Sequence, residues 1–488
     1  KQIYIPPPPN SGSLKLVQQP SNFIQFVCTS GYGGAVYLFI NNEGQVTITN
    51  SIFYQCNGII GGGIGVSIES GGKLTIDGQC NFTECNALIG GGIYVEESGI
   101  NSKLILDDGI IFEGCYTSFS EPEFGGGGIY IYFTEQGSMI VNNVQFKDCN
   151  AFYGGGIIID GYSQAKLIFN GTQFTQCYAY QGGGIYVNIQ IENSILELIG
   201  VIFEQCEAIM YDGGGIYVNV GFGVQFILSE ICQFKDCYAG NKGGGLYLNN
   251  YESQFQVIGF AQFLNCESSF GGGILIQFSE QSTIDIQNIS LEYCISIYGG
   301  GIYSDLNDYG TLNIKDTTFD SCTCTQPGNG GGLYLYQGIS SIISITNSSF
   351  INCNTISNSY YQKYGWGGAI YIQTSITAEN LNESNFIMRN LTFNGCSAVN
   401  SIGNNLHICS INTLTTGLAI KNGNLLTVID LSNHPNIISD LYTSMSYAYD
   451  YMGINESLET SNPGTINPDL HNTLFEQSFI YNVSNPTY

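Results

Sequence analysis

The stretch Phe82-Thr83-Glu84-Cys85-Asn86-Ala87, followed by Gly90-Gly91-Gly92-Ile93-Tyr94-Val95, decides the fold of this 488-residue chain, because versions of it recur along most of the sequence. Most copies start 28 to 31 residues apart. Repetition at such a period indicates an array of stacked structural units. Thirteen cysteines mark the copies: Cys28, Cys56, Cys85, Cys115, Cys149, Cys177, Cys206, Cys237, Cys266, Cys294, Cys322, Cys353 and Cys396.

Each repeat contains segments in which apolar residues alternate with polar ones, such as Val46-Thr47-Ile48, Leu74-Thr75-Ile76 and Leu312-Asn313-Ile314. This period of two indicates half-buried strands, and the Asn, Asp or Gly that often follows favours turns. About three short strands per repeat predict a coil of a parallel β-helix. A solenoid of helical repeats is excluded, since glycine triplets break helices.

The repeat also predicts where each side chain points. Coils about 4.8 Å apart give thirteen coils a length of roughly 60 Å. Alternation places Ile93, Val95 and Phe82 inside and Tyr94 outside. The glycine triplets form a ladder where the chain turns sharply. Long insertions at 116–124 and 354–364 fall at the same point of the repeat, between the cysteine and the triplet, and so mark one edge of the rod.

The paired motifs resemble the Gly-Gly-Ala-Ile and Phe-x-x-Asn repeats of polymorphic outer-membrane-protein passenger domains. The resemblance covers about residues 24 to 409, with Cys in place of the family's Asn and no C-terminal membrane barrel. It implies an all-β, right-handed, single-stranded parallel β-helix of about 13 coils and, as a hint, a surface-adhesive role. Fold alone does not fix function.

The cysteine ladder has two interpretations. The thiols either stack in the core as small apolar groups or form disulfides between neighbouring coils. Cys80 and Cys232 each stand two residues before a Phe and should point inward; Cys324 and Cys409 also lie outside the ladder. No cofactor is expected. A zinc site is not expected either, because no histidine precedes His407 and no Cys-x-x-Cys pair occurs.

An outward tyrosine ladder also has two interpretations, cross-coil stacking or an aromatic interface for a neighbouring subunit or sugar rings. Its members are Tyr37, Tyr94, Tyr130, Tyr186, Tyr217, Tyr247, Tyr303, Tyr334 and Tyr371.

Composition favours a secreted protein. Twelve Lys plus Arg against 39 Asp plus Glu give a net charge of −27, which excludes nucleic acid as a partner. No apolar run is long enough for membrane insertion, and the absence of an initiator Met and signal core predicts a processed chain. Eight sequons, together with 17 cysteines, predict an extracellular or cell-surface protein carrying N-linked glycans. The sequons are Asn81, Asn170, Asn288, Asn347, Asn382, Asn390, Asn455 and Asn482.

Enzyme signatures are poor. Polysaccharide lyase or glycosidase chemistry needs paired carboxylates or a base near the sugar. Asp107-Asp108 is an adjacent acidic pair, and no basic residue accompanies it in its motif. All three histidines (His407, His434, His471) lie at or beyond the end of the repeats. We therefore expect a non-enzymatic protein.

The two ends differ from the repeats. We divide the chain into an extended, Pro-rich N-terminal tail (1–22), the β-helix (23–409) and a C-terminal cap and tail (410–488), with a capping strand at 424–431 and a short helix from Pro468. Open sheet edges must be capped or paired. We expect a structural glycoprotein that assembles head-to-tail with itself, the tails adding strands to the next subunit; the alternative is that each tail caps its own rod. The other functions considered are an adhesin or glycan-binding rod and a polysaccharide-degrading enzyme.

Overall fold

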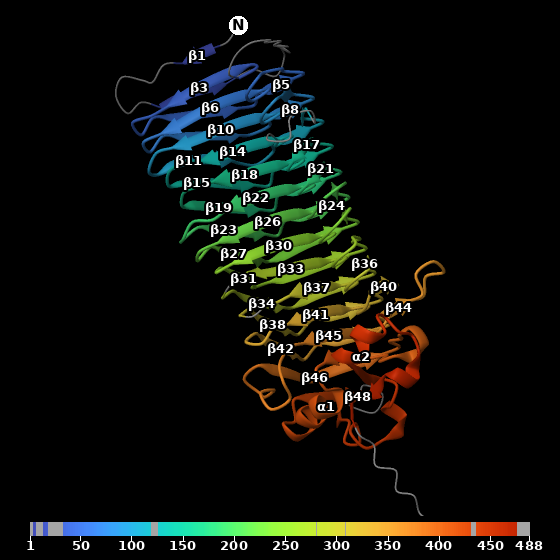
Figure 1. Ribbon diagram of the computed structural model, residues 1–488. Helices are drawn as coiled ribbons and strands as arrows, with labels where there is room; N and C mark the ends of the chain where they lie inside the picture. The colour runs from blue at the N-terminus through green and yellow to red at the C-terminus, as the bar shows by residue number, and fades with distance from the viewer. Residues whose placement is uncertain are drawn as a thin grey trace, which may run out of the picture.

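The computed structural model describes residues 3–5, 13–17, 33–118, 125–279, 281–307, 309–430 and 436–475. Within them the chain forms a parallel β-solenoid of about 11 turns, with its first strands at one end and its helices at the other (Figure 1). Each turn adds one strand to each of three faces, named face 1, face 2 and face 3 in chain order. The prediction of stacked parallel coils is confirmed.

Face 1 is a 16-stranded sheet in the described residues, parallel up to its last strand. Its strands are β1 (Ile3–Ile5), β3 (Val36–Ile40), β6 (Ile64–Glu69), β10 (Ile93–Ser98), β14 (Ile129–Phe133), β18 (Ile157–Gly161), β22 (Ile185–Ile189), β26 (Ile216–Gly221), β30 (Leu246–Tyr251), β33 (Ile274–Ser279), β37 (Ile302–Asp305), β41 (Leu333–Gln337), β45 (Ile370–Thr374), β47 (Leu406–Ser410), β50 (Tyr451–Asn455) and β51 (Asn472–Thr473).

Faces 2 and 3 join in a 26-stranded sheet of the described chain, because β46 (Phe386–Asn394) runs through both. Face 2 also has β2 (Ser13–Val17), β4 (Gln45–Thr49), β7 (Lys73–Asp77), β11 (Ser102–Leu106), β15 (Gly137–Asn142), β19 (Ala165–Asn170), β23 (Ile195–Ile199), β27 (Gln225–Ser229), β31 (Gln254–Val257), β34 (Thr283–Gln287), β38 (Thr311–Lys315), β42 (Ile342–Thr346), β48 (Leu426–Asp430) and β49 (Asn436–Ile437). Face 3 also has β5 (Ile52–Tyr54), β8 (Asn81–Thr83), β12 (Ile111–Glu113), β16 (Gln145–Lys147), β20 (Gln173–Thr175), β24 (Ile202–Glu204), β28 (Ile231–Lys235), β32 (Phe260–Leu264), β35 (Ile289–Glu292), β39 (Thr318–Asp320) and β43 (Ser349–Ile351).

Short strands follow most of the ladder cysteines and form two small sheets, separated at Glu267 and Ser268. They are β9 (Asn86–Ala87), β13 (Tyr116–Thr117), β17 (Asn150–Tyr153), β21 (Tyr178–Gln181), β25 (Glu207–Ala208), β29 (Tyr238–Ala239), β36 (Ile295–Ser296), β40 (Thr323–Thr325) and β44 (Asn354–Ile356).

The number of turns differs slightly from the thirteen motif copies. The solenoid has about 11 turns in which the three faces have separate strands. Each of these turns ends at one ladder cysteine, from Cys56 to Cys353. The copy at Cys28 lies outside the described residues. The copy at Cys396 belongs to an irregular turn, where β46 replaces the two separate strands of faces 2 and 3.

The core is built from the inward positions. Ile93, Val95 and Phe82 are fully buried, as predicted, whereas Tyr94 points outward and is half-buried. On face 3 the rings from Phe53 to Phe263 stack coil upon coil, as for Phe146 and Phe174 at 4.8 Å and 6°. Leu291 interrupts this column, which resumes at Phe319. The interior is therefore one continuous apolar column along the rod.

The three glycines of a triplet are required for three different reasons. In the copy at 90–92, Gly90 has a φ of 64°, which other residues rarely adopt. A Cβ on Gly91 would lie 2.3 Å from the carbonyl oxygen of Gly127 in the next coil. A Cβ on Gly92 would lie 2.8 Å from the Phe112 ring. The predicted glycine ladder thus combines a turn with close backbone and ring contacts.

Parts of the expected tails belong to the solenoid. Ile3–Ile5 and Ser13–Val17 pair with β3 and β4 as first rungs, because their alternating apolar residues match that register. At the other end β47 and β50 continue face 1 beyond residue 409. Antiparallel β51 covers the edge of β50, and antiparallel β49 covers that of β48. Within the described residues, the tails thus pair with their own rod rather than extend away from it.

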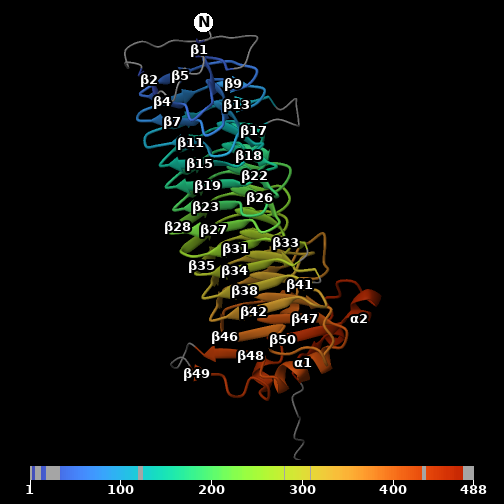
Figure 2. The same ribbon diagram turned by 90° about the vertical axis from the view of Figure 1, so that its left-hand side faces the viewer.

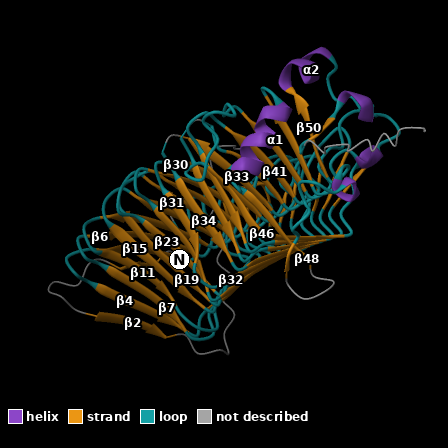
Figure 3. Ribbon diagram, turned by 90° about the horizontal axis from the view of Figure 1, so that it is seen from below, coloured by secondary structure: helices purple, strands orange, loops and turns teal. Residues whose placement is uncertain are grey.

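Helical segments gather at the C-terminal end of the stacked strands (Figures 2 and 3). They are α1 (Thr413–Asn422), α2 (Glu456–Ser461) and three 3-10 turns, Val399–Ser401, Met445–Tyr447 and Pro468–Leu470. The predicted capping strand is β48, but Pro468 begins only a 3-10 turn, because the chain then pairs with β50 as β51.

Candidate functional site

The cysteine column lies inside the solenoid and consists of free thiols in the described residues. Each ladder Sγ from Cys85 onward donates to the carbonyl oxygen of the Phe, or Leu291, of the preceding coil, as Cys177 does to Phe146 at 3.5 Å. Burial raises the pKa of the Cys149 and Cys177 thiols well above the ordinary value. Protonated, buried thiols are poor nucleophiles, so Cys149 and Cys177 act chemically as core.

Cysteines outside the ladder are buried as well. Cys80 and Cys232 point into the core, as predicted. Cys324 is fully buried, and Cys409 packs with Trp366 in a second, smaller cluster. Within the described part of the chain, no group of three or more metal-ligating side chains is close enough to hold an ion.

The tyrosine column follows face 1 on its outer side, as predicted. Tyr186, Tyr217 and Tyr247 stack at 4.8 Å with ring planes 6° and 4° apart. Aromatic residues between the ladder cysteine and the glycine triplet pack on the column, for example Tyr153 on Tyr186 at 5.1 Å between ring centres. Tyr247 and Tyr371 are buried and the other members half-buried. Because neighbouring rings cover one another's faces, the geometry favours cross-coil stacking over stacking on sugar rings.

A row of polar side chains runs beside the tyrosines, two residues further along face 1. It consists of Asp160, Asn188, Asn219, Asn249 and Gln277, which occupy one register position on consecutive coils and are named the amide row. Nδ2 of each Asn donates at 2.9 Å to the Oδ1 of the preceding residue in the row. The Tyr247 hydroxyl donates to Gln277 Oε1 at 3.1 Å. Sequence reasoning missed this row, although Asn occurs two residues after Tyr in three copies of the motif.

Seven sequon asparagines lie in the described residues, and Asn482 lies outside them. Asn170, Asn288, Asn347, Asn382 and Asn390 are exposed, whereas Asn81 and Asn455 are half-buried. Asn170, Asn288, Asn347 and Asn390 share the corner between faces 2 and 3. The last three have φ of 51–55°, which Asn tolerates, so the turn itself explains the choice of Asn there. Asn390 Nδ2 donates to Asn347 Oδ1 at 3.0 Å.

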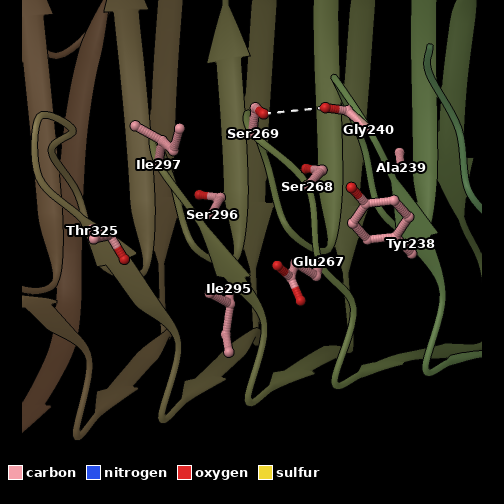
Figure 4. Close-up of a pocket in the computed structure, with 10 residues that line it drawn as sticks. All are labelled: Tyr238, Ala239, Gly240, Glu267, Ser268, Ser269, Ile295, Ser296, Ile297 and Thr325. Atoms are coloured by element: carbon pink, nitrogen blue, oxygen red, sulfur yellow. Dashed lines mark hydrogen bonds between the residues drawn. The ribbon is translucent and has the colours of Figure 1, made fainter. Parts of the chain in front are cut away.

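A shallow pocket of about 190 Å³ opens beside the short strands, between β29 and β40 (Figure 4). It lies over two short loops, Cys266 to Gly271 and Cys294 to Gly299, flanked by longer ones. Glu267 supplies the one carboxylate of its lining. Ser269 Oγ donates to the Gly240 carbonyl oxygen, and the buried Ser296 Oγ has no partner in the described residues. A single carboxylate does not form the acid pair of a glycosidase.

The residues considered for catalysis have structural partners. Asp107 accepts from Asn142 Nδ2 at 2.7 Å, and Asp108 accepts from Asn143 Nδ2 at 2.6 Å. His407 and His471 meet at 3.0 Å inside the C-terminal cap. His434 lies outside the described residues.

No protein-family model matches the chain, and no curated protein or solved structure is detectably similar to it. The resemblance to outer-membrane-protein repeats therefore stays a prediction drawn from the motifs. None of the helices in the described ranges has the length and hydropathy of a membrane span.

Proposed function

We propose that this protein is a secreted structural glycoprotein, the subunit of an extracellular filament or surface coat that assembles head-to-tail. The observation that carries the proposal is a stripe of exposed apolar side chains just before α1 and along its outer side. Helix α1 lies at the C-terminal end of the rod (Figures 1 and 2). Ile411, Leu414 and Leu418 are 51%, 47% and 42% exposed, while the opposite side packs on the solenoid through Thr416, Gly417 and Ile420.

The occupant of this stripe is the N-terminal end of a second copy. Residues 1–42 contain two lysines and no carboxylate, whereas residues 410–475 contain six carboxylates and one lysine. Opposite charge at the two ends favours head-to-tail contact over head-to-head contact. Since β49 and β51 cover the sheet edges at the C-terminal end, the contact uses side chains rather than an added strand.

Light scattering and negative-stain microscopy over a range of protein and salt concentrations test this proposal. We expect end-to-end oligomers that grow with protein concentration and shorten at high salt, since salt screens the charged ends. Leu414→Glu with Leu418→Glu should abolish them. The control Thr415→Glu adds charge on the same helix at an exposed residue outside the stripe. Single rods at every concentration, or equal loss in the control, would refute the proposal.

A further inference from the structure

We propose that the amide row on face 1 binds a neutral, extended polysaccharide that lies along the rod axis. This goes beyond the proposed assembly, because it uses the side of the rod and not its ends. The site comprises the amide row (Asp160, Asn188, Asn219, Asn249, Gln277) and the exposed aromatic rings next to it.

The first argument is hydrogen-bonding capacity. A primary amide has two N–H donors and two acceptor lone pairs. Within the row Asn219 gives one N–H to Asn188 and accepts one from Asn249. One donor and one lone pair of this half-buried side chain stay unused by the ladder. Sugar hydroxyls both donate and accept, so they match the unused donor and lone pair of Asn219.

The ladder also fixes the amides in place. Neighbouring amides hold one another at 2.9 Å, and Gln190 Nε2 donates to Asn188 Oδ1 at 3.4 Å. A ligand therefore meets side chains that have already lost their rotamer freedom, which lowers the entropic cost of binding. Coils repeat at about 4.8 Å. In an extended β-1,4-linked glycan neighbouring rings face opposite ways, so the same hydroxyls return on every second sugar, which corresponds to about two coils.

Aromatic rings at the corner after face 1 supply apolar contact for pyranose rings. Tyr162 is 70% exposed and meets Tyr132 edge-on at 6.1 Å. Phe222 is 44% exposed and packs against Tyr251 at 4.9 Å. Unlike the stacked tyrosine column, these rings are T-shaped pairs that keep a face accessible.

The charge pattern selects a neutral ligand. Asp160 ends the amide row on one side, and Asp305 follows Gln277 in register on the other. With a net charge of −27, the rod repels polyuronates and sulfated glycans.

Isothermal titration with defined oligosaccharides tests the site. The probes are tri- and hexasaccharides of cellulose, chitin and β-1,4-mannan, with hexagalacturonate as the anionic counterpart. We expect at least one neutral hexamer to bind, at least fivefold more tightly than its trimer because it spans more rungs, and hexagalacturonate not to bind.

Two variants and one control assign the binding to this site. Asn188→Ala, Asn219→Ala and Asn249→Ala together should weaken binding at least tenfold. Tyr162→Ser with Phe222→Ser, both at exposed positions, should weaken it at least threefold without affecting folding. The control Asn142→Ala, Asn265→Ala and Asn313→Ala removes three cross-coil amide–carboxylate bonds at other places on the rod and should bind normally.

Several results would overturn the proposal. These are no binding by any neutral hexamer, equal affinity for trimer and hexamer, binding of hexagalacturonate at equal strength, or equal loss in the control. If the triple Asn variant does not fold, unchanged binding by the Tyr162 and Phe222 variant also overturns it.

Discussion

Glu97 is the most unusual residue of the interior. It is fully buried at an inward position of β10, between Ile68 and Phe133 on the neighbouring coils. Its Oε2 accepts from the Ser138 N–H at 3.1 Å, and its Oε1 has no partner in the described residues. Gly137 makes room for it, since a Cβ there would clash with Oε2. Burial raises the pKa of Glu97 to about 8.

This pKa predicts that the rod loses stability as pH rises. Above the unfolded pKa near 4.5 the folded state holds a proton that the unfolded state has released, so the contribution falls as pH rises toward 8. Glu97→Gln should remove about 4 kcal/mol of this loss by pH 9. Thermal melting from pH 5 to 9 measures it. The control Glu96→Gln changes an outward residue and should melt like the native protein at every pH. If the melting temperature of Glu97→Gln fell with pH as steeply as that of the native protein, the prediction would be wrong.

Residue patterns explain which positions the sequence could predict. Burial of Phe82 or Ile93 follows from alternation alone. The residue before each ladder cysteine from Cys56 onward has a positive φ of 49–68°, and it is Gln, Glu, Tyr or Ser as often as Asn, Asp or Gly. That turn was not predicted, because no single residue type marks it. Neither was the amide row, whose members are too few to stand out in an Asn-rich chain.

At the scale of elements, the glycine triplet is the most demanding part of a turn. A Cβ on Gly183 would lie 2.3 Å from the carbonyl oxygen of Gly214 and 2.6 Å from the backbone of Glu207. Both neighbours are backbone atoms in the next coil, so neither can rotate away.

We therefore predict that Gly183→Ala costs more than about 3 kcal/mol of stability or prevents folding, because overpacking against backbone has no local relief. Urea unfolding followed by circular dichroism measures the change. Gln173→Ala, at an exposed position of β20, is the matched substitution and should stay within about 0.5 kcal/mol of the native protein. A near-native midpoint for Gly183→Ala would contradict this view of the triplet.

Strands were predictable where the period of two was clear, as in β4, β7 and β38. Helix α1 was not, because its sequence Thr-Leu-Thr-Thr-Gly-Leu-Ala-Ile-Lys-Asn places only one large apolar side chain, Ile420, on the buried side. Thr413, Thr416 and Gly417 pack inward there, and Gly417 lies against the Leu474 carbonyl oxygen. Tertiary contact rather than helical periodicity places this element.

At the scale of the whole molecule, the C-terminal cap is held by a buried aromatic cluster. His407 takes the place of a tyrosine in the outer column next to Tyr371. His471 Nε2 lies 3.2 Å from the Thr465 carbonyl oxygen, which makes its Nδ1 the acceptor for His407 Nε2. His407 Nδ1 is then a bare acceptor without a partner in the described chain. Trp366 donates to the same Thr465 oxygen at 2.9 Å.

Acid should release this cap. Burial lowers the pKa of both His407 and His471 below 6.5, so the unfolded segment binds more protons and stability falls as pH drops below that value. Trp366, the one tryptophan in the sequence, reports the change by fluorescence. We expect a red shift of the Trp366 emission at pH 5 relative to pH 7.5. His407→Gln, which keeps a donor for His471 but cannot charge, should reduce this shift. Unchanged emission between the two pH values would argue against the prediction.

The array of coils was predictable as a whole because the same sequence motif occurs in thirteen copies. Its ends were not, since they carry no motif. Within the described residues, four terminal strands pair with their own rod: β1, β2, β49 and β51. This pairing depends on the register of the strands, which the composition of the tails does not reveal.

The thiol column has a consequence for the length of the rod. Cys206 bonds to the Phe174 oxygen just as Cys177 bonds to the Phe146 oxygen, and Tyr178 stands in register with Glu207. Removing residues 178–206 would join Cys177 to Glu207 with each contact re-formed by the next coil. The length of the rod can therefore change in steps of one coil, about 4.8 Å each. Gene duplication or loss of a single coil can reset its reach without redesigning either end.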